Sequence, residues 1–269
     1  INRTSIFFQH PKEVFVCCLI VSLRCVFWVT PYIRGGGIDS PRPASQRAAA
    51  FILTAAMLTT LAAPAFAKTW YIEDGDITVK ASDTGNDVTQ KDKTTYGDKD
   101  TIITNRNEGT ASSNTVTIEA EKKDDKVEVT LKDVNIDTSS RKKAAVSVTG
   151  EGDTNIKLNG DNALKSDIYR SGIYGSGSLT ISGGETDSLT AQGGAGGSGI
   201  HISRNGSLTI SGGTVTANGD DGGSGIYSSN SSSVTISGGT VTANGGSGNI
   251  SGGDGIYSDS GDVTISGGS

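Results

Sequence analysis

Four rings are the side chains best suited to bind a ligand, and each follows a Gly-Ile pair. They stand 27, 26 and 30 residues apart, at Tyr174, His201, Tyr227 and Tyr257. Neighbouring residues of a strand point to opposite faces, so an inward Ile directs the following ring outward. Stacked repeats, rising roughly 4.8 Å each, would align these rings as one exposed aromatic stripe. Aromatic faces pack on the C–H faces of sugars, which predicts glycan binding. A ladder that only stiffens the sheet is the alternative.

Carboxylates form the second group of reactive side chains, and they lie in or near predicted turns. They are Asp220, Asp221, Asp254 and Asp259, with Glu185 and Asp187 in a further turn. Oxygen ligands at turns bind calcium, which makes calcium the candidate metal, although no cofactor is required. Paired carboxylates could also hydrolyse glycosides. The third interpretation is solvated acids that keep the chain soluble.

Other chemistry is disfavoured. From Lys68 onward His201 is the only histidine, so histidine metal clusters and a repeated Ser-His-Asp triad are excluded. Gly194 to Gly199 matches a dinucleotide-binding pattern by letter but opens no predicted helix. From Lys68 onward the chain carries 17 Lys and Arg against 27 Asp and Glu, a net charge of −10, which disfavours nucleic acid and anionic membranes as partners. We expect no catalytic residues, and a monomer.

Repeats must position these side chains. The hexapeptide LTISGG begins at Leu179 and Leu208, and VTISGG begins at Val234 and Val263, with spacings of 29, 26 and 29 residues. This marker runs in phase with the Gly-Ile-aromatic marker. Two markers at one period of this length indicate a solenoid.

The alternation within each repeat predicts strands. Leu208 and Ile210 share one face, with Thr209 and Ser211 on the other. Three short strands per coil, joined by Gly-rich corners, predict an all-β, right-handed parallel β-helix of about six coils over residues 115–269. Val146 precedes Ile173 by the same interval that separates Tyr174 from His201, which extends the period toward the N-terminus. Val129 and Ile156 precede Leu179 at successive spacings of 27 and 23 residues.

Residues 68–114 fit no coil spacing, so they predict an N-terminal cap, with Trp70 covering the open end of the solenoid. At the other end the sequence stops inside a repeat, on TISGGS. We therefore expect the protein to continue beyond Ser269.

The front of the chain predicts secretion. Residues 38–67 combine arginines, an apolar run and Ala65-Phe66-Ala67, as in a signal peptide cleaved before Lys68. The protein is then secreted or at the cell surface, without membrane insertion after cleavage. Residues 1–37 carry all three cysteines and are interpreted as non-native upstream translation.

The segments SLTISGGTVTANG, GSGIYS and DGIYS resemble carbohydrate-binding β-helix domains of secreted and surface proteins from Gram-positive, clostridial-type bacteria. The likeness covers residues 115–269, and TWYIEDGDITV is similar too. It implies a right-handed parallel β-helix, with calcium and acidic or cellulosic polysaccharides as ligands. The Asp-Gly-Ile turn that the family associates with calcium is matched by Asp254-Gly255-Ile256, whereas the other coils carry Ser-Gly-Ile.

These observations predict a secreted or surface module that binds a polysaccharide, or another host or plant glycan, on the aromatic stripe. A structural stalk or adhesin spacer is the first alternative, and a polysaccharide-degrading β-helix enzyme is the second. Residues 171–269 hold seven acids and one arginine, so an anionic glycan would be repelled unless calcium bridged it. A neutral glucan needs no such bridge and should bind with little dependence on salt.

Overall fold

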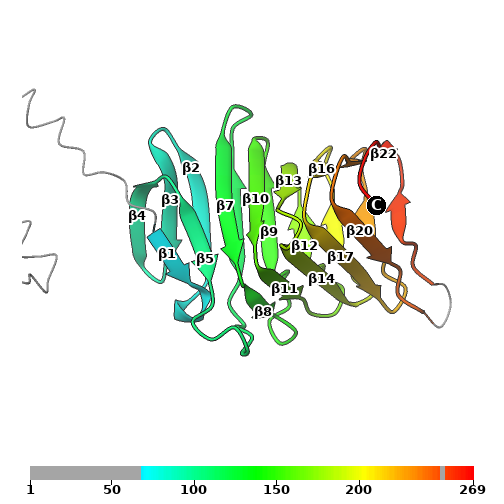
Figure 1. Ribbon diagram of the computed structural model, residues 1–269, viewed down its shortest axis with the longest axis horizontal. Coiled ribbons are helices and arrows are strands. Elements are labelled where there is room, and N and C mark those ends of the chain that lie inside the picture. The colour runs from blue at the N-terminus through cyan, green and yellow to red at the C-terminus, as the bar shows by residue number, and fades with distance from the viewer. Residues whose placement is uncertain (1–67, 249–251) are drawn as a thin grey trace, which may run out of the picture. The chain divides into compact units, whose positions relative to one another are not determined.

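The computed structural model describes residues 68–248 and 252–269 (Figure 1). The predicted upstream segment and signal peptide, 1–37 and 38–67, lie outside the described residues. Within them the chain is all-β, and its one helical element is a short 3-10 turn, Ile72–Asp74. No helix of the described part is both long enough and apolar enough to cross a membrane. The predicted parallel β-helix of about six coils is confirmed.

Each coil of residues 116–244 contributes one strand to each of three sheets. The first sheet contains eight strands: β1 (Lys68–Tyr71), β5 (Thr101–Thr104), β7 (Lys126–Lys132), β10 (Asp153–Asn159), β13 (Ser178–Ser182), β16 (Ser207–Ile210), β19 (Ser233–Ile236) and β22 (Val263–Ile265). The third sheet contains five: β8 (Asn135–Asp137), β11 (Asp161–Lys165), β14 (Ser188–Ala195), β17 (Thr214–Asp220) and β20 (Thr240–Asn244). All pairs in both sheets are parallel.

The second sheet, which carries the aromatic stripe, contains nine strands. Seven pair in parallel: β2 (Ile77–Ser82), β6 (Val116–Ala120), β9 (Val146–Gly150), β12 (Ile173–Gly175), β15 (Ile200–Ile202), β18 (Ile226–Ser228) and β21 (Ile256–Ser258). The other two, β3 (Gly85–Gln90) and β4 (Lys93–Asp98), extend this sheet beyond β2 by antiparallel pairing.

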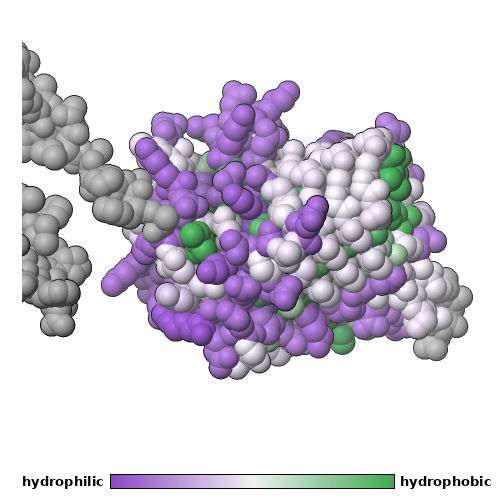
Figure 2. All heavy atoms as spheres, in the orientation of Figure 1, coloured by the Kyte–Doolittle hydropathy of each residue, from purple (hydrophilic) through white to green (hydrophobic). Residues whose placement is uncertain are grey.

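Inward aliphatic ladders form the core. In the second sheet, Ile173, Ile200 and Ile226 lie in register on successive coils and are fully buried. Burying one such side chain stabilises the fold by about 1.5 to 3 kcal/mol. The outward face changes along the chain: charged side chains give a hydrophilic surface over β7 and β10, whereas Ser and Thr give a paler surface over β13, β16 and β19 (Figure 2).

One ladder corrects the predicted register. Ile156 pairs with Ile181 and not with Leu179. Leu179 instead lies opposite Thr154, which therefore points into the core. The Thr154 side chain is buried, and its hydroxyl has no hydrogen-bond partner. Because the inward residue Thr154 is polar, the aliphatic pattern does not show where this strand begins to face the core. The predicted pairing of Ile156 with Leu179 is therefore wrong by two residues.

Parallel pairing extends further toward the N-terminus than residue 115. Strand β5 pairs with β7, and β2 pairs with β6, so residues 68–114 contribute strands to two of the sheets. Ile77 and its partner Val116 are separated by more than one period of the solenoid, because the hairpin of β3 and β4 is inserted between them. The insertion explains why this segment fits no coil spacing. Trp70 is buried here and donates a hydrogen bond to Asp98 at 2.9 Å.

The substitution Thr154→Val should raise the free energy of unfolding by about 1 to 2 kcal/mol, because it replaces a buried, unpaired hydroxyl with a methyl group of the same shape. Chemical denaturation measures this. The matched control is Thr180→Val, which changes an outward Thr on the neighbouring strand and should leave stability within about 0.5 kcal/mol. Equal effects of the two variants would contradict an unpaired hydroxyl at Thr154.

Candidate functional site

The aromatic stripe lies on the outward face of the second sheet. Tyr174, His201, Tyr227 and Tyr257 pair in register on four successive coils. The centroids of His201 and Tyr227 are 4.6 Å apart with the rings stacked at 23°. Tyr174 meets His201 edge-on at 5.4 Å, and Tyr227 meets Tyr257 at 5.4 Å and 42°. The rings therefore contact one another along the axis of the solenoid.

This stacking limits what the stripe can bind. The facing surfaces of His201 and Tyr227 cover each other, and Tyr257, at 43% exposed, is the most accessible ring of the four. Polar tips also bridge coils: the Tyr174 hydroxyl shares a hydrogen bond with Ser203 Oγ at 2.9 Å, and His201 Nε2 does so with Ser229 Oγ at 2.9 Å. The stripe thus joins neighbouring coils, and sugar binding by its rings stays a prediction.

The surroundings of His201 favour its neutral form. Burial within the stripe lowers the pKa of its imidazole, and the charge of Asp259 opposes this only in part. The neutral ring stacks on Tyr227 while Nε2 contacts Ser229.

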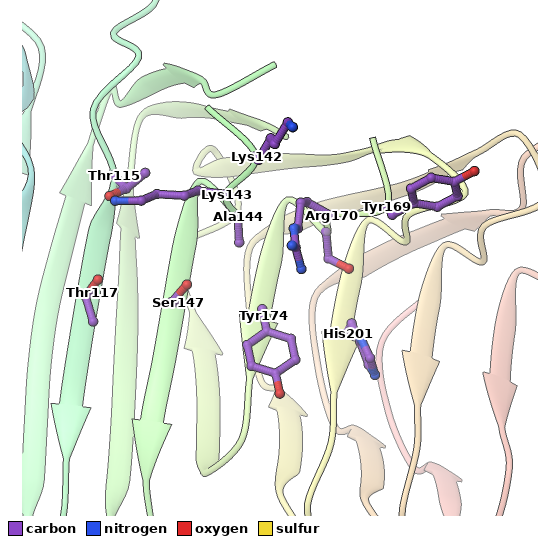
Figure 3. A pocket seen from close by; sticks show the side chains of 11 residues that line it. Thr115, Thr117, Lys142, Lys143, Ala144, Ser147, Tyr169, Arg170, Tyr174 and His201 are labelled. Carbon is purple, nitrogen blue, oxygen red and sulfur yellow. The ribbon is translucent and has the colours of Figure 1, made fainter. Parts of the chain in front are cut away.

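A groove of about 560 Å³ lies beside Tyr174 and His201, at the corner that leads from the third sheet into the second (Figure 3). Hydroxyls, rings and cations line it: Thr115, Thr117, Lys142, Lys143, Ala144, Ser147, Tyr169, Arg170, Ser171, Tyr174 and His201. In Figure 3 the Arg170 side chain points toward Tyr174. Ser147 and Thr117 continue the row of the stripe on the two preceding coils. We name this space the basic groove.

Three cations border the basic groove. Lys143 lies 3.4 Å from Asp76, whose carboxylate also binds Arg141 at 2.9 Å. Burial favours the neutral form of Asp76, but the Thr115 N–H and the two cations prevail and lower its pKa. Within residues 68–248 and 252–269, Lys142 and Arg170 form no salt bridge, so their charges are available to a ligand.

The cations and Tyr169 did not emerge from the sequence analysis. They come from corner loops, which carry neither the aliphatic alternation nor the glycine pairs of the repeats. The available signal was spacing alone: Lys142, Tyr169 and Gly196 recur at equal intervals of one coil and share positive φ values of 54°, 57° and 72°. A common period and backbone conformation place equivalent turns at one corner.

The predicted acidic residues are dispersed. Asp220 lines a second groove of about 590 Å³ together with Lys165 and Gln192, and Asp254 lines a smaller one with Tyr227 and Tyr257. Asp221 is an exposed turn residue with a φ of 41°, and the Asp259 carboxylate accepts hydrogen bonds from Asn230 N–H and from Ser260. No group of three or more His, Cys, Asp or Glu side chains in the described part of the chain could hold a metal ion, and calcium stays a prediction.

Comparison with known proteins found no matching family model, no matching curated protein and no matching solved structure.

The substitution His201→Tyr should reduce the loss in free energy of unfolding that the protein undergoes as the pH falls from 7 to 5. The folded state holds His201 with a pKa below its unfolded value of about 6.5, so the unfolded state binds more protons and stability falls as pH drops below that value. Denaturation at pH 7 and pH 5 should therefore show a smaller loss for the variant than for the wild type. Titration of the carboxylates that do not interact with His201 is common to both proteins and cancels. Equal losses would contradict a buried neutral imidazole.

Removing single rings should show how much each contact of the stripe contributes to the free energy of unfolding. Tyr227→Ala breaks two ring pairs and Tyr257→Ala breaks one. At about 0.5 to 1.5 kcal/mol for each aromatic pair, the Tyr227 variant should lose about twice as much of this pair energy, in addition to lost burial. Urea denaturation of both variants tests this. A larger loss for Tyr257→Ala would mean that the rings do not stabilise each other.

Proposed function

We propose that the chain is a polysaccharide-binding module of a secreted or cell-surface protein, and that the glycan lies in the basic groove beside the aromatic stripe. The observation that carries the proposal is the convergence on one concave surface of a ring edge, hydroxyls and two cations that lack a salt bridge among the described residues. Ligand sites are typically concave, with apolar walls and a few well-placed polar groups.

The chemistry of the lining suits a sugar chain. Thr117, Ser147 and Ser171 offer hydroxyls that both donate and accept hydrogen bonds. Arg170 presents planar donors that bind hydroxyl or carboxylate oxygens, and Tyr174 supplies an aromatic edge.

The groove changes the expected preference for a neutral glycan. That expectation rested on the seven acids after Ser171, whereas the basic groove is bordered by Lys142, Lys143 and Arg170. Repulsion by distant acids is screened within about 10 Å at 0.1 M salt. We therefore expect the groove to accept neutral and acidic sugars.

A structural stalk or adhesin spacer is the second candidate. The mutual stacking of His201 and Tyr227, together with the inter-coil hydrogen bonds of Tyr174 and His201, supports it. The degrading-enzyme alternative stays a prediction.

The substitution Arg170→Ala should weaken glycan binding about tenfold or more, because a charge-assisted contact is lost. Affinity electrophoresis in hydroxyethylcellulose, arabinoxylan, galactomannan and polygalacturonate measures retention of the wild type and the variant. The matched control is Arg204→Ala, which removes an exposed arginine of another turn and does not line the basic groove.

Retention of the wild type by none of these polymers would contradict the proposal and favour the stalk. Retention that falls equally in both arginine variants would place the glycan outside the basic groove.

A further inference from the structure

The loop of Asp167 to Arg170 forms a ridge between two grooves. Tyr169 and Arg170 line the basic groove, while Asp167 and Ile168 line the groove of about 590 Å³ that also contains Gln192. At the crest, Ile168 is 57% exposed and Tyr169 is 78% exposed. Apolar side chains exposed together between two polar grooves differ from the Ser and Thr surface elsewhere on these coils.

Tyr169 adopts a backbone conformation that an aromatic residue rarely takes. Its φ is 57°, in the left-handed region, where a bulky side chain is a true outlier. The equivalent residue of the next coil is Gly196, which adopts a φ of 72° without steric conflict. The two turns correspond because Tyr169 N–H donates to Ala195 and Gly196 N–H donates to Asp220, each at 2.8 Å. A glycine would thus satisfy this turn, yet a tyrosine occupies it.

Surrounding contacts hold the ridge in this conformation. The Asp167 carboxylate accepts hydrogen bonds from Ile168 N–H at 2.7 Å and from Lys142 N–H at 2.8 Å. The Ser166 hydroxyl donates to the Arg170 carbonyl at 2.7 Å. Strain that the surroundings over-determine in this way persists chiefly where a site needs it.

The next coil provides a glycine bed under the ridge. A Cβ at Gly196 would lie 2.7 Å from Cδ1 of Tyr169, and a Cβ at Gly194 or Gly197 would lie 2.1 or 2.0 Å from a ridge carbonyl oxygen. Because these three residues lack a Cβ, the ridge packs directly on the backbone of the next coil, while the Tyr169 ring stays largely exposed to solvent.

We propose that Tyr169 is the aromatic platform of the glycan site, and that the bound glycan crosses the ridge from the basic groove into the groove of Gln192. The proposal rests on the proposed function and names the residue and the ligand class: a chain of several sugar units rather than a single sugar. The ring is far more exposed than those of the stripe, so its face is open to the C–H face of a sugar.

The test compares Tyr169→Ala with Tyr96→Ala in the full chain, on whichever polymer of the panel retains the wild type. Tyr96 is 75% exposed on β4 and lines none of the grooves described above, so it is a matched exposed tyrosine. We expect Tyr169→Ala to lose at least tenfold in affinity and Tyr96→Ala to bind like the wild type. Hexasaccharides of that polymer should bind the wild type at least tenfold more tightly than disaccharides, and Gln192→Ala should reduce this gain.

The variant Tyr169→Asn separates the strain from binding, because Asn tolerates the left-handed region. We expect its melting temperature to rise above that of Tyr169→Ala while its binding is equally weak. Wild-type binding that Tyr169→Ala leaves intact would overturn the platform while the proposed function stands. Equal affinity for disaccharide and hexasaccharide would overturn the crossing of the ridge, and a wild type that none of the panel retains would overturn both proposals.

Discussion

Parallel pairing of each strand with its equivalent one coil away is the constraint on which the molecule depends. It stacks Ile173, Ile200 and Ile226 into one buried ladder, and in doing so it forces the following residues into one outward row. The core and the aromatic stripe are therefore two faces of a single register. A shift of one residue in any coil would exchange them, because side chains alternate with a period of two. Corner loops are placed by the same register, although they take no part in the ladders.

The solenoid could be predicted from sequence because two markers repeat in phase. Aliphatic residues at alternate positions and glycine pairs at the corners are local signals, and the pairing of Val146 with Ile173 followed directly from the common spacing. Where an inward position is polar, as at Thr154, or where a hairpin interrupts a coil, as between β2 and β5, the period is no longer visible in the sequence. Pairing in space then decides the register, and only the structure shows it.

The candidate site could be predicted only in part. The alignment of Tyr174, His201, Tyr227 and Tyr257 follows from strand alternation, but their mutual stacking depends on side-chain rotamers that no spacing specifies. The basic groove depends on loops of different coils whose cations look like ordinary solvated charges in the sequence. Its shape depends on the backbone conformation of these turns. Non-glycine residues such as Tyr169 adopt positive φ values there, which residue type alone does not predict.

The glycine bed also restricts how such a chain can diversify. Solenoids grow by duplication and exchange of whole coils, which requires any coil to follow any other. The coil that carries Asp167 to Arg170 lacks this freedom. Its successor must have glycine at the positions of Gly194 and Gly197, where a Cβ would collide with carbonyl oxygens of the loop, and a Cβ at Gly196 would meet the Tyr169 ring. Recombination would therefore have to move these two coils as one unit. The same restriction recurs on the following coils, where a Cβ at Gly223 or Gly253 would lie 1.9 Å from a carbonyl oxygen of the coil before. Exchange of a coil therefore requires that the coil after it keep these glycines.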